Sequence, residues 1–149
     1  AQLPYTSNTV KGTLYQGGIN VPMFISGDGV SRIGTDDNLL TSTDLFATIA
    51  EIAGVSVAEI NDSKSFKELF SESITIRDYQ YSEMDDGNND AWTIRNDKYK
   101  LISNINANEE MYDLISDPYE QNNLLNGNMT AEEMTAKAEL ETELINIRQ

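Results

Sequence analysis

The sequence has no cysteine and no histidine among its 149 residues. Disulfide bonds within these residues are therefore excluded, together with thiol nucleophiles and zinc sites built on thiolate or imidazole ligands. The absence of histidine also excludes every catalytic triad that relies on an imidazole base.

Positively charged residues are scarce as well, since 10 lysines and arginines stand against 25 aspartates and glutamates, for a net charge of −15. A nucleic-acid partner is not expected, because its phosphates need a basic surface. No apolar run approaches the roughly 20 residues of a membrane span, so no such span is predicted. Residues 1–5 also lack the charged and apolar parts of a signal peptide. We interpret the acidic excess as a solvated surface.

Apolar residues make up 39% of the chain, which predicts a folded core. Residues 11–26 organise the first half of the sequence, with a lysine-bearing loop, a double-glycine turn at residues 17–18 and an apolar run. Because this run hardly alternates with polar residues, we predict a strand over residues 20–26 that is buried on both faces. Such strands are typical of parallel sheets covered by helices.

Three further segments have helical signals. Residues 42–53 place apolar side chains on one helical face, and Gly54 is suited to end that helix. Residues 65–70 predict a short helix or turn. Residues 130–147 begin with the capping-box pattern Thr-x-x-Glu and predict a longer helix. The apolar face predicted for the helix at residues 42–53 consists of Leu45, Ile49, Ile52 and Ala53. The face predicted for the helix at residues 130–147 consists of Ala136, Leu140, Leu144 and Ile147.

From residue 76 onward the pattern changes to the two-residue alternation that is typical of strands. Residues 76–83 and 91–95 have this alternation, and an Asn-Asp pair can form the turn into a further strand at residues 98–102. Residues 110–114 predict one more strand. We therefore predict a small antiparallel sheet packed against the C-terminal helix.

Several blocks of the sequence carry more specific patterns. Residues 11–22 read Lys-x-x-x-Tyr-Gln-Gly-Gly-Ile-x-Val-Pro, and residues 95–102 read Arg-x-x-x-Tyr-Lys-Leu-Ile. Residues 110–124 read Glu-x-Tyr-Asp-Leu-x-x-Asp-Pro-x-Glu-x-x-Asn-Leu. Together these blocks resemble the C-terminal portion of the sulfatase family, within the alkaline phosphatase superfamily. Two departures are Gln16, where that family usually has glutamate, and Asn20, where it often has a basic residue.

The resemblance implies an α/β fold, here an α+β fragment. It would contain the end of an alkaline-phosphatase-like parallel sheet with a helix, followed by a small antiparallel sheet packed on a C-terminal helix. Residues 1–75 would then be the C-terminal part of the α/β catalytic domain of a sulfatase. Residues 76–149 would form a C-terminal subdomain of sheet plus helix.

The resemblance also implies that the chain is the C-terminal fragment of a sulfuric ester hydrolase of the arylsulfatase type, and that the fragment alone is inactive. Lys11 is expected to contact the sulfate group, as both a catalytic and a substrate-binding residue. No metal ligand or cofactor is expected in the fragment, whereas Ca²⁺ and formylglycine are expected in the full-length enzyme. The expected partners are a sulfated carbohydrate or aryl sulfate and the N-terminal remainder of the enzyme. The family further implies a periplasmic or extracellular location.

Two alternative functions remain open. One is a phosphodiester or phosphonate monoester hydrolase of the same superfamily, and the other is a non-catalytic, acidic binding domain. Two local patterns also have a simpler interpretation as turns. Residues 85–90 are rich in the oxygen ligands that suit Ca²⁺, but such residues also dominate turns. Residues 116–120 resemble the nucleophile motif of sulfatases, but Glu120 stands where that motif needs an arginine.

Overall fold

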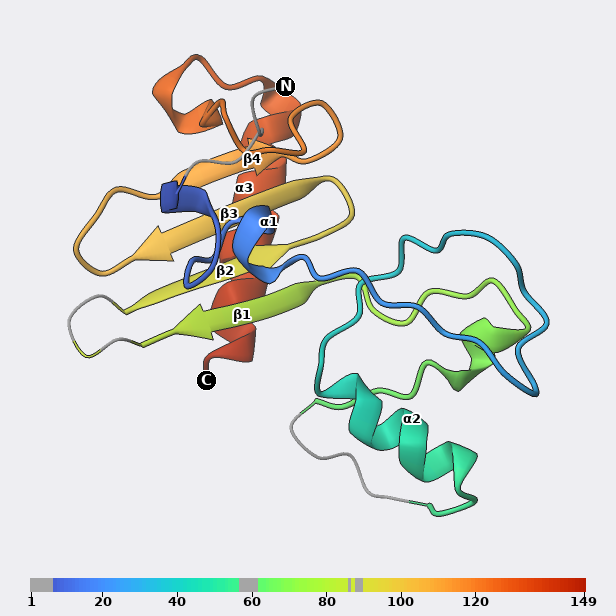
Figure 1. Ribbon diagram of the computed structural model, residues 1–149. Helices are drawn as coiled ribbons and strands as arrows, with labels where there is room; N and C mark the ends of the chain where they lie inside the picture. The colour runs from blue at the N-terminus through green and yellow to red at the C-terminus, as the bar shows by residue number, and fades with distance from the viewer. Residues whose placement is uncertain (1–6, 57–61, 86, 88–89) are drawn as a thin grey trace. The chain divides into compact units, whose positions relative to one another are not determined.

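The computed structural model describes residues 7–56, 62–85, 87 and 90–149 (Figure 1). The chain divides into two compact units. We call the unit formed by residues 1–22 and 81–149 the sheet unit, and the unit formed by residues 23–80 the loop unit. The sheet unit thus joins the lysine-bearing block near the start of the chain to the C-terminal half. A domain boundary between residues 75 and 76 stays a prediction.

A four-stranded sheet with the strand order β1-β2-β3-β4 is the centre of the sheet unit (Figure 1). The strands are β1 (Gln80–Met84), β2 (Ala91–Arg95), β3 (Tyr99–Asn104) and β4 (Glu110–Asp113). Strands β2 and β3 pair antiparallel, as do β3 and β4, which confirms the predicted small antiparallel sheet. The predicted turn at Asn96 is also confirmed, because its side-chain oxygen accepts hydrogen bonds from the backbone N–H groups of Lys98 and Tyr99.

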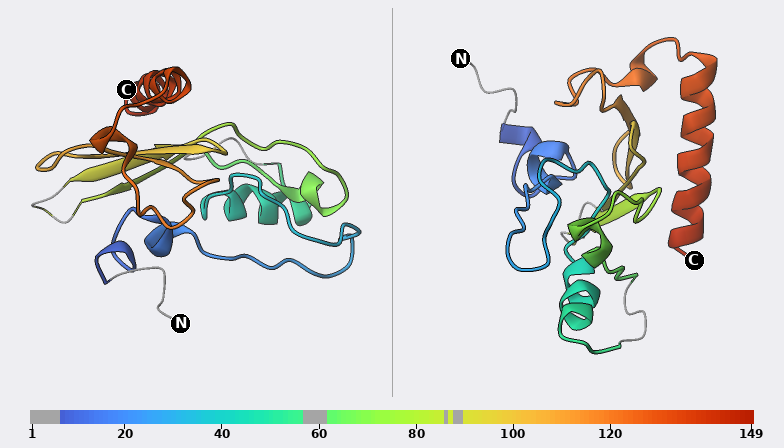
Figure 2. Two further views of the ribbon diagram at one scale, coloured as in Figure 1. Left: turned by 90° about the horizontal axis from the view of Figure 1, so that it is seen from above. Right: turned by 90° about the vertical axis from the view of Figure 1, so that its right-hand side faces the viewer.

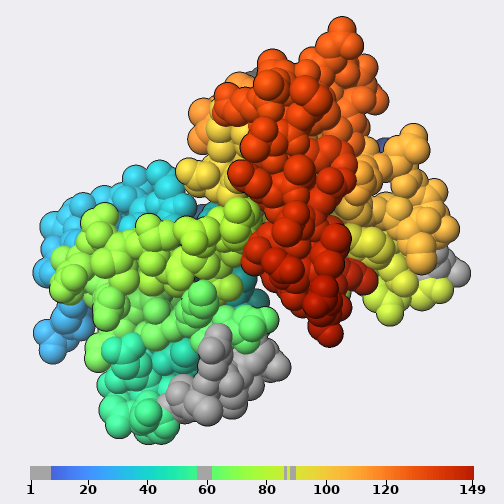
Figure 3. All heavy atoms as spheres, turned by 180° about the vertical axis from the view of Figure 1, so that it is seen from behind, coloured from blue at the N-terminus to red at the C-terminus, as the bar shows by residue number. Residues whose placement is uncertain are grey.

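Helix α3 (Ala131–Ile147) covers one face of this sheet (Figures 2 and 3). The capping box is confirmed, since the Thr130 hydroxyl accepts a hydrogen bond from the Glu133 N–H and the Glu133 carboxylate accepts one from the Thr130 N–H. The buried stripe of the helix consists of Ala136, Leu140 and Leu144. Ile147 was predicted to extend the stripe, but it is partly exposed because the helix ends there. No helix in the described residues is long and apolar enough to cross a membrane.

The opposite face of the sheet is covered by the short helix α1 (Gln16–Ile19) and the residues just before it (Figure 2). A small apolar cluster joins them to the strands: Leu14, Ala91, Ile102, Tyr112 and Leu114. Burial of these side chains is the main favourable contribution to packing on this face. The lysine-bearing block is therefore attached to the antiparallel sheet through its own core residues.

The strand predicted over residues 20–26 is wrong, because these residues have no regular secondary structure. Their apolar side chains are largely solvent-exposed, and Phe24 is 93% exposed. A run of apolar residues shows that a segment is suited to burial, but a strand also needs a neighbouring strand for its backbone hydrogen bonds. The structure pairs no strand with this segment in the described residues, so the parallel sheet expected here is absent from them.

Helix α2 (Asp44–Ile52) and the 3-10 turn η2 (Lys67–Phe70) are the regular elements of the loop unit, and both were predicted. Gly54 has a φ of 74°, as expected of a residue that ends a helix. The orientation of α2 differs from the prediction, because its polar residues Asp44 and Thr48 are buried. Its apolar residues Leu45, Phe46, Ile49 and Ile52 are exposed.

Hydrogen bonds explain why the polar side of α2 faces inward. The buried Asp44 carboxylate accepts hydrogen bonds from the backbone N–H groups of Thr41 and Lys64, and it forms an ion pair with Arg77. The Thr48 hydroxyl accepts a hydrogen bond from the Phe66 N–H at 3.0 Å. These contacts bind the helix to the neighbouring loops and leave its apolar face without a cover in the described residues.

Candidate functional site

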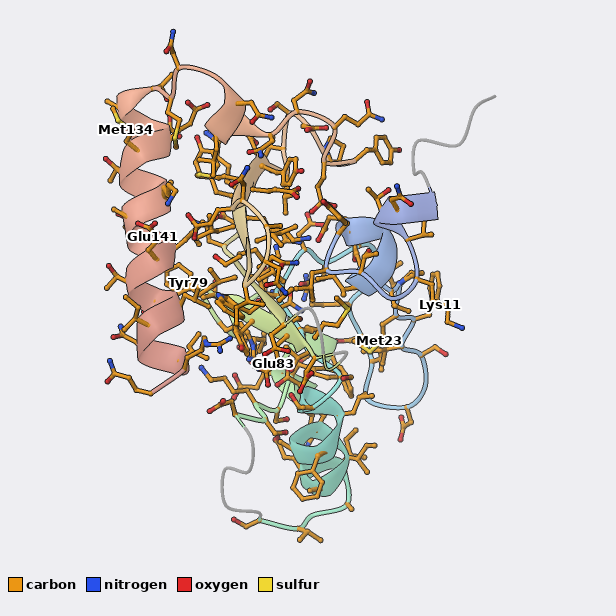
Figure 4. All side chains as sticks on the ribbon, turned by 90° about the vertical axis from the view of Figure 1, so that its left-hand side faces the viewer. Lys11, Met23, Tyr79, Glu83, Met134 and Glu141 are labelled. Carbon is orange, nitrogen blue, oxygen red and sulfur yellow. The ribbon has the colours of Figure 1, made fainter. Side chains whose placement is uncertain are left out.

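Lys11, the predicted sulfate-contacting residue, lies in the loop between the 3-10 turn η1 (Ser7–Thr9) and helix α1. Its side chain is exposed and points away from the sheet (Figure 4). Within residues 7–56, 62–85, 87 and 90–149, no acceptor lies within hydrogen-bond or ion-pair distance of its ammonium group. The described residues therefore leave the ammonium group of Lys11 without a partner.

The backbone on both sides of Lys11 is tightly folded. Gly12 has a φ of 80°, a conformation that glycine adopts readily, and the Thr13 hydroxyl donates a hydrogen bond of 2.6 Å to the Val10 carbonyl oxygen. Helix α1 packs directly on this turn, because a Cβ atom at Gly18 would lie 2.3 Å from the Thr13 carbonyl oxygen. Gly18 is therefore required for close packing, and neither Gly17 nor Gly18 has the positive φ that the predicted turn at residues 17–18 would use.

A buried carboxylate connects this loop to the sheet. One oxygen of Glu120 accepts a hydrogen bond of 2.5 Å from the Gln16 backbone N–H, at the start of α1. The other oxygen lies 2.5 Å from the Lys100 ammonium group, on strand β3. The side chains of Lys100 and Glu120 are both 0% exposed. An ion pair buried this completely costs desolvation energy, and its hydrogen bonds have to offset that cost.

A second contact to the same loop involves Tyr15. Its hydroxyl donates to the Glu110 carboxylate on strand β4, with oxygen–oxygen distances of 2.7 and 2.9 Å. The Tyr112 hydroxyl donates to the same carboxylate, and the two rings meet edge to face with centroids 6.2 Å apart. Three consecutive residues, Leu14 to Gln16, are therefore held by the sheet.

The pKa values of these groups are shifted by burial and by each other. Burial raises the pKa of Tyr15 to about 12, and the hydrogen bond to Glu110 acts in the same direction. The pKa of Tyr112 is raised for the same reasons. Burial lowers the pKa of Lys100 to about 8, and the Glu120 carboxylate opposes this shift. At pH 7 both tyrosines are therefore protonated donors and Lys100 still carries its charge.

The described residues do not provide a metal site. They contain no group of three or more aspartate, glutamate, histidine or cysteine side chains that could hold a cation. Residues 86, 88 and 89 of the candidate calcium loop lie outside the described residues, and the Gly87 N–H donates to the Asp85 carboxylate, as in a turn. The described residues therefore contain no site that fits Ca²⁺, which the family resemblance implies for the full-length enzyme.

The nucleophile motif is also absent from residues 116–120. These residues form the turn after β4, in which the Asp117 N–H donates to the Asp113 carbonyl oxygen and the Glu120 N–H donates to the Asp117 carbonyl oxygen. Glu120 itself is committed to Lys100 and Gln16. The interpretation of this segment as a turn is therefore confirmed.

The role of Lys11 stays a prediction, and the residues that hold its loop, Lys100 and Glu120, were not predicted from the sequence. Lys100 lies in a strand pattern in which a lysine is most often solvent-exposed, and Glu120 lies in a turn. The signal was nevertheless present, because both residues belong to the specific patterns at residues 95–102 and 110–124.

Comparison with known families identifies the class of protein. The model of the family "N-sulphoglucosamine sulphohydrolase, C-terminal" matches residues 9–149. This match spans nearly the whole chain, so the chain belongs to that sulfatase family. A search of curated proteins found no match.

Solved sulfatase structures share the fold. A protein solved in complex with its substrate D-glucosamine-2-N,6-O-disulfate is 28% identical, with a TM-score of 0.60 over 69% of this chain and 22% of its own. A 2-O glycosaminoglycan sulfatase is 23% identical, with a TM-score of 0.70 over 83% of this chain and 29% of its own. A Bacteroides thetaiotaomicron protein from work on glycosaminoglycan metabolism is 21% identical, with a TM-score of 0.55 over 70% of this chain and 24% of its own. The chain thus spans less than a third of the length of these proteins.

Proposed function

We propose that this chain is the C-terminal part of a sulfatase and that Lys11 contacts the sulfate group of the substrate. The observation that carries the proposal is the state of Lys11. It is an exposed lysine with no partner in the described residues, on a tightly folded loop, in a chain that belongs to a sulfatase family over residues 9–149.

Lysine suits this role because its ammonium group is a compact charge with three rotatable donors. As the bond between sulfur and the leaving group breaks, negative charge builds on the oxygens of the transferring group. A positive charge that is already in place stabilises that change more than it stabilises the bound substrate. The contribution of Lys11 would therefore be to kcat.

The proposed substrate is a sulfated carbohydrate that contains glucosamine. The name of the family and the substrate of the 28% identical protein both support sulfated glucosamine over an aryl sulfate. Arylsulfatase-type specificity is the less favoured form of the same proposal. From the family resemblance we also propose a periplasmic or extracellular location.

The rest of the enzyme would be an N-terminal part of the same polypeptide. The exposed apolar face of α2 supports this view, because Leu45, Phe46, Ile49 and Ile52 form a surface that monomeric proteins usually cover. The solved sulfatases are also more than three times longer than the part that this chain matches. We propose that the N-terminal part covers this face. It would also hold the formylglycine nucleophile and Ca²⁺, since the part of the chain that the structure describes has no group of side chains that fits a metal ion.

A substrate panel on the full-length protein tests the proposal. It would contain glucosamine sulfated at the 2-N and 6-O positions, an aryl sulfate, a phosphodiester and a phosphonate monoester. We expect the highest kcat/KM with one of the sulfated glucosamines. A preference for the phosphodiester or the phosphonate monoester would establish the alternative hydrolase. Binding of sulfated carbohydrate without any turnover would establish a non-catalytic domain.

A further inference from the structure

The buried Lys100–Glu120 pair has no role in the proposed contact with sulfate, yet it joins three distant parts of the sheet unit. Glu120 lies in the turn after β4, Lys100 lies on β3, and Gln16 begins α1. The two oxygens of one carboxylate are shared between the strand and the loop. Arg95, on the neighbouring strand, adds a favourable charge to Glu120.

The conformation of Glu120 is unusual. It has a φ of 55°, a backbone region that is strained for a residue other than glycine. Such a conformation persists where the surroundings fix it, and here the surroundings are the contacts to Lys100 and Gln16. A strained backbone that carries a buried, charged side chain is costly for stability alone, which points to a role in positioning.

The path from Glu120 to Lys11 is short and rigid. Gln16 is held by Glu120, Tyr15 by Glu110, and Leu14 by the apolar cluster. Thr13 closes the turn around Lys11, and Gly18 presses α1 against the same turn. A displacement of the start of α1 would therefore be passed on to the Lys11 backbone.

We propose that Glu120, fixed by Lys100, is a positioning residue that holds the Lys11 loop in the orientation needed to contact sulfate. The inference rests on the proposed function of Lys11. Glu120 and Lys100 do not touch the substrate in this account, since both side chains are fully buried. They act through the backbone N–H of Gln16.

Glu120→Gln tests the proposal in the full-length enzyme, because glutamine has only one carbonyl oxygen to share between Lys100 and Gln16. Hydrogen exchange of residues 10–18 should become about tenfold faster or more, as expected for the loss of a charge-assisted hydrogen bond. The kcat should fall by about tenfold, with a smaller change in KM, because a misplaced catalytic group slows the chemical step more than it weakens substrate binding. The control is Glu132→Gln, which breaks an exposed ion pair with Lys98 in the same unit. It should change neither quantity.

A double-mutant comparison separates positioning from general loss of structure. If Glu120 acts through Lys11, Glu120→Gln should lower kcat no further in an enzyme that already carries Lys11→Ala. Losses that multiply would overturn the proposal, because Glu120 would then act by another route. Wild-type kcat in Lys11→Ala alone would overturn the proposed function of Lys11. A different result would overturn the positioning role of Glu120. It is hydrogen exchange of residues 10–18 in Glu120→Gln at the wild-type rate.

A second variant keeps the test decisive if Glu120→Gln does not fold. The pair Lys100→Met with Glu120→Gln removes both buried charges and frees the glutamine carbonyl oxygen for the Gln16 N–H. Neutral replacements of buried ion pairs are often tolerated. We expect exchange of residues 10–18 to be faster and kcat to be lower than in the wild-type enzyme, because Lys100 no longer fixes the side chain at position 120. A folded double variant with a fast-exchanging loop and wild-type kcat would overturn the proposal, because the loop would not need to be fixed.

Discussion

Gly18→Ala is the substitution for which the structure makes the clearest prediction about the Lys11 loop. A Cβ atom at this position would lie 2.3 Å from the Thr13 carbonyl oxygen and 2.8 Å from both the Thr13 hydroxyl and the Val10 carbonyl oxygen. Two of these atoms belong to the backbone, so the turn around Lys11 has to move. Glycine to alanine in a helix ordinarily stabilises by about 0.5–1 kcal/mol, whereas overpacking costs about 1–3 kcal/mol. The clash therefore outweighs the gain in helix propensity.

The expected result is a displaced Lys11 loop in a folded protein. In the full-length enzyme, kcat should fall by about 10- to 100-fold, the scale for misplacing a group by about 1 Å. Hydrogen exchange of residues 10–13 should become faster. Gly127→Ala is the matched control, because its Cβ atom would be 3.8 Å from the nearest atom, the Leu124 carbonyl oxygen. Wild-type kcat and exchange in Gly18→Ala would refute the reasoning that close packing on α1 shapes the loop.

Three further predictions concern stability. Ile49 is 62% exposed in this chain. If the N-terminal part covers α2, Ile49→Asp should lower the free energy of unfolding of the full-length protein by about 1–3 kcal/mol, measured as a lower Tm. A change within about 0.5 kcal/mol would contradict that cover. The pKa of Tyr15 in the folded protein is raised to about 12, so the contribution of Tyr15 to stability is complete below pH 10 and should be lost between pH 10 and 12. In urea unfolding, the free energy of unfolding of Tyr15→Phe should therefore fall less between pH 10 and 12 than that of the wild type. Thr130→Ala should cost about 1 kcal/mol by loss of the N-cap of α3, and a wild-type midpoint in urea would contradict the capping box.

The C-terminal half of the fold could be predicted because its signals are local. The capping box at Thr130 fixes the start of α3 through contacts three residues apart. The turn at Asn96 fixes the β2–β3 hairpin through contacts within the turn itself. In both cases the residues that decide the structure are close together in the sequence.

The apolar run at residues 20–26 and the face of α2 could not be placed in the same way. Their apolar residues were predicted to be buried, but they are largely exposed, and the described residues contain no partner that covers them. The inward side of α2 is decided instead by hydrogen bonds that Asp44 and Thr48 accept from the backbone N–H groups of Lys64 and Phe66. Periodicity reports which residues are apolar, not which neighbours are available.

The candidate site shows the same limit. Lys11 could be singled out from its sequence block, whereas the burial of Lys100 could not, because a strand pattern does not say which face is covered. Its partner Glu120 lies 20 residues away, in a turn where its backbone has a positive φ. Long-range ion pairs of this kind emerge only when the strands are assembled.

The central claim is that Lys11 contacts the sulfate group, and steady-state kinetics of Lys11→Ala in the full-length enzyme test it most directly. The matched control is Lys64→Ala, which removes another exposed lysine. The account predicts that kcat on sulfated glucosamine falls by about 10²–10³ in Lys11→Ala, the scale for losing one donor to a developing oxyanion, with an unchanged Tm. Lys64→Ala should retain wild-type kcat. Wild-type kcat in Lys11→Ala with an unchanged Tm would contradict the account.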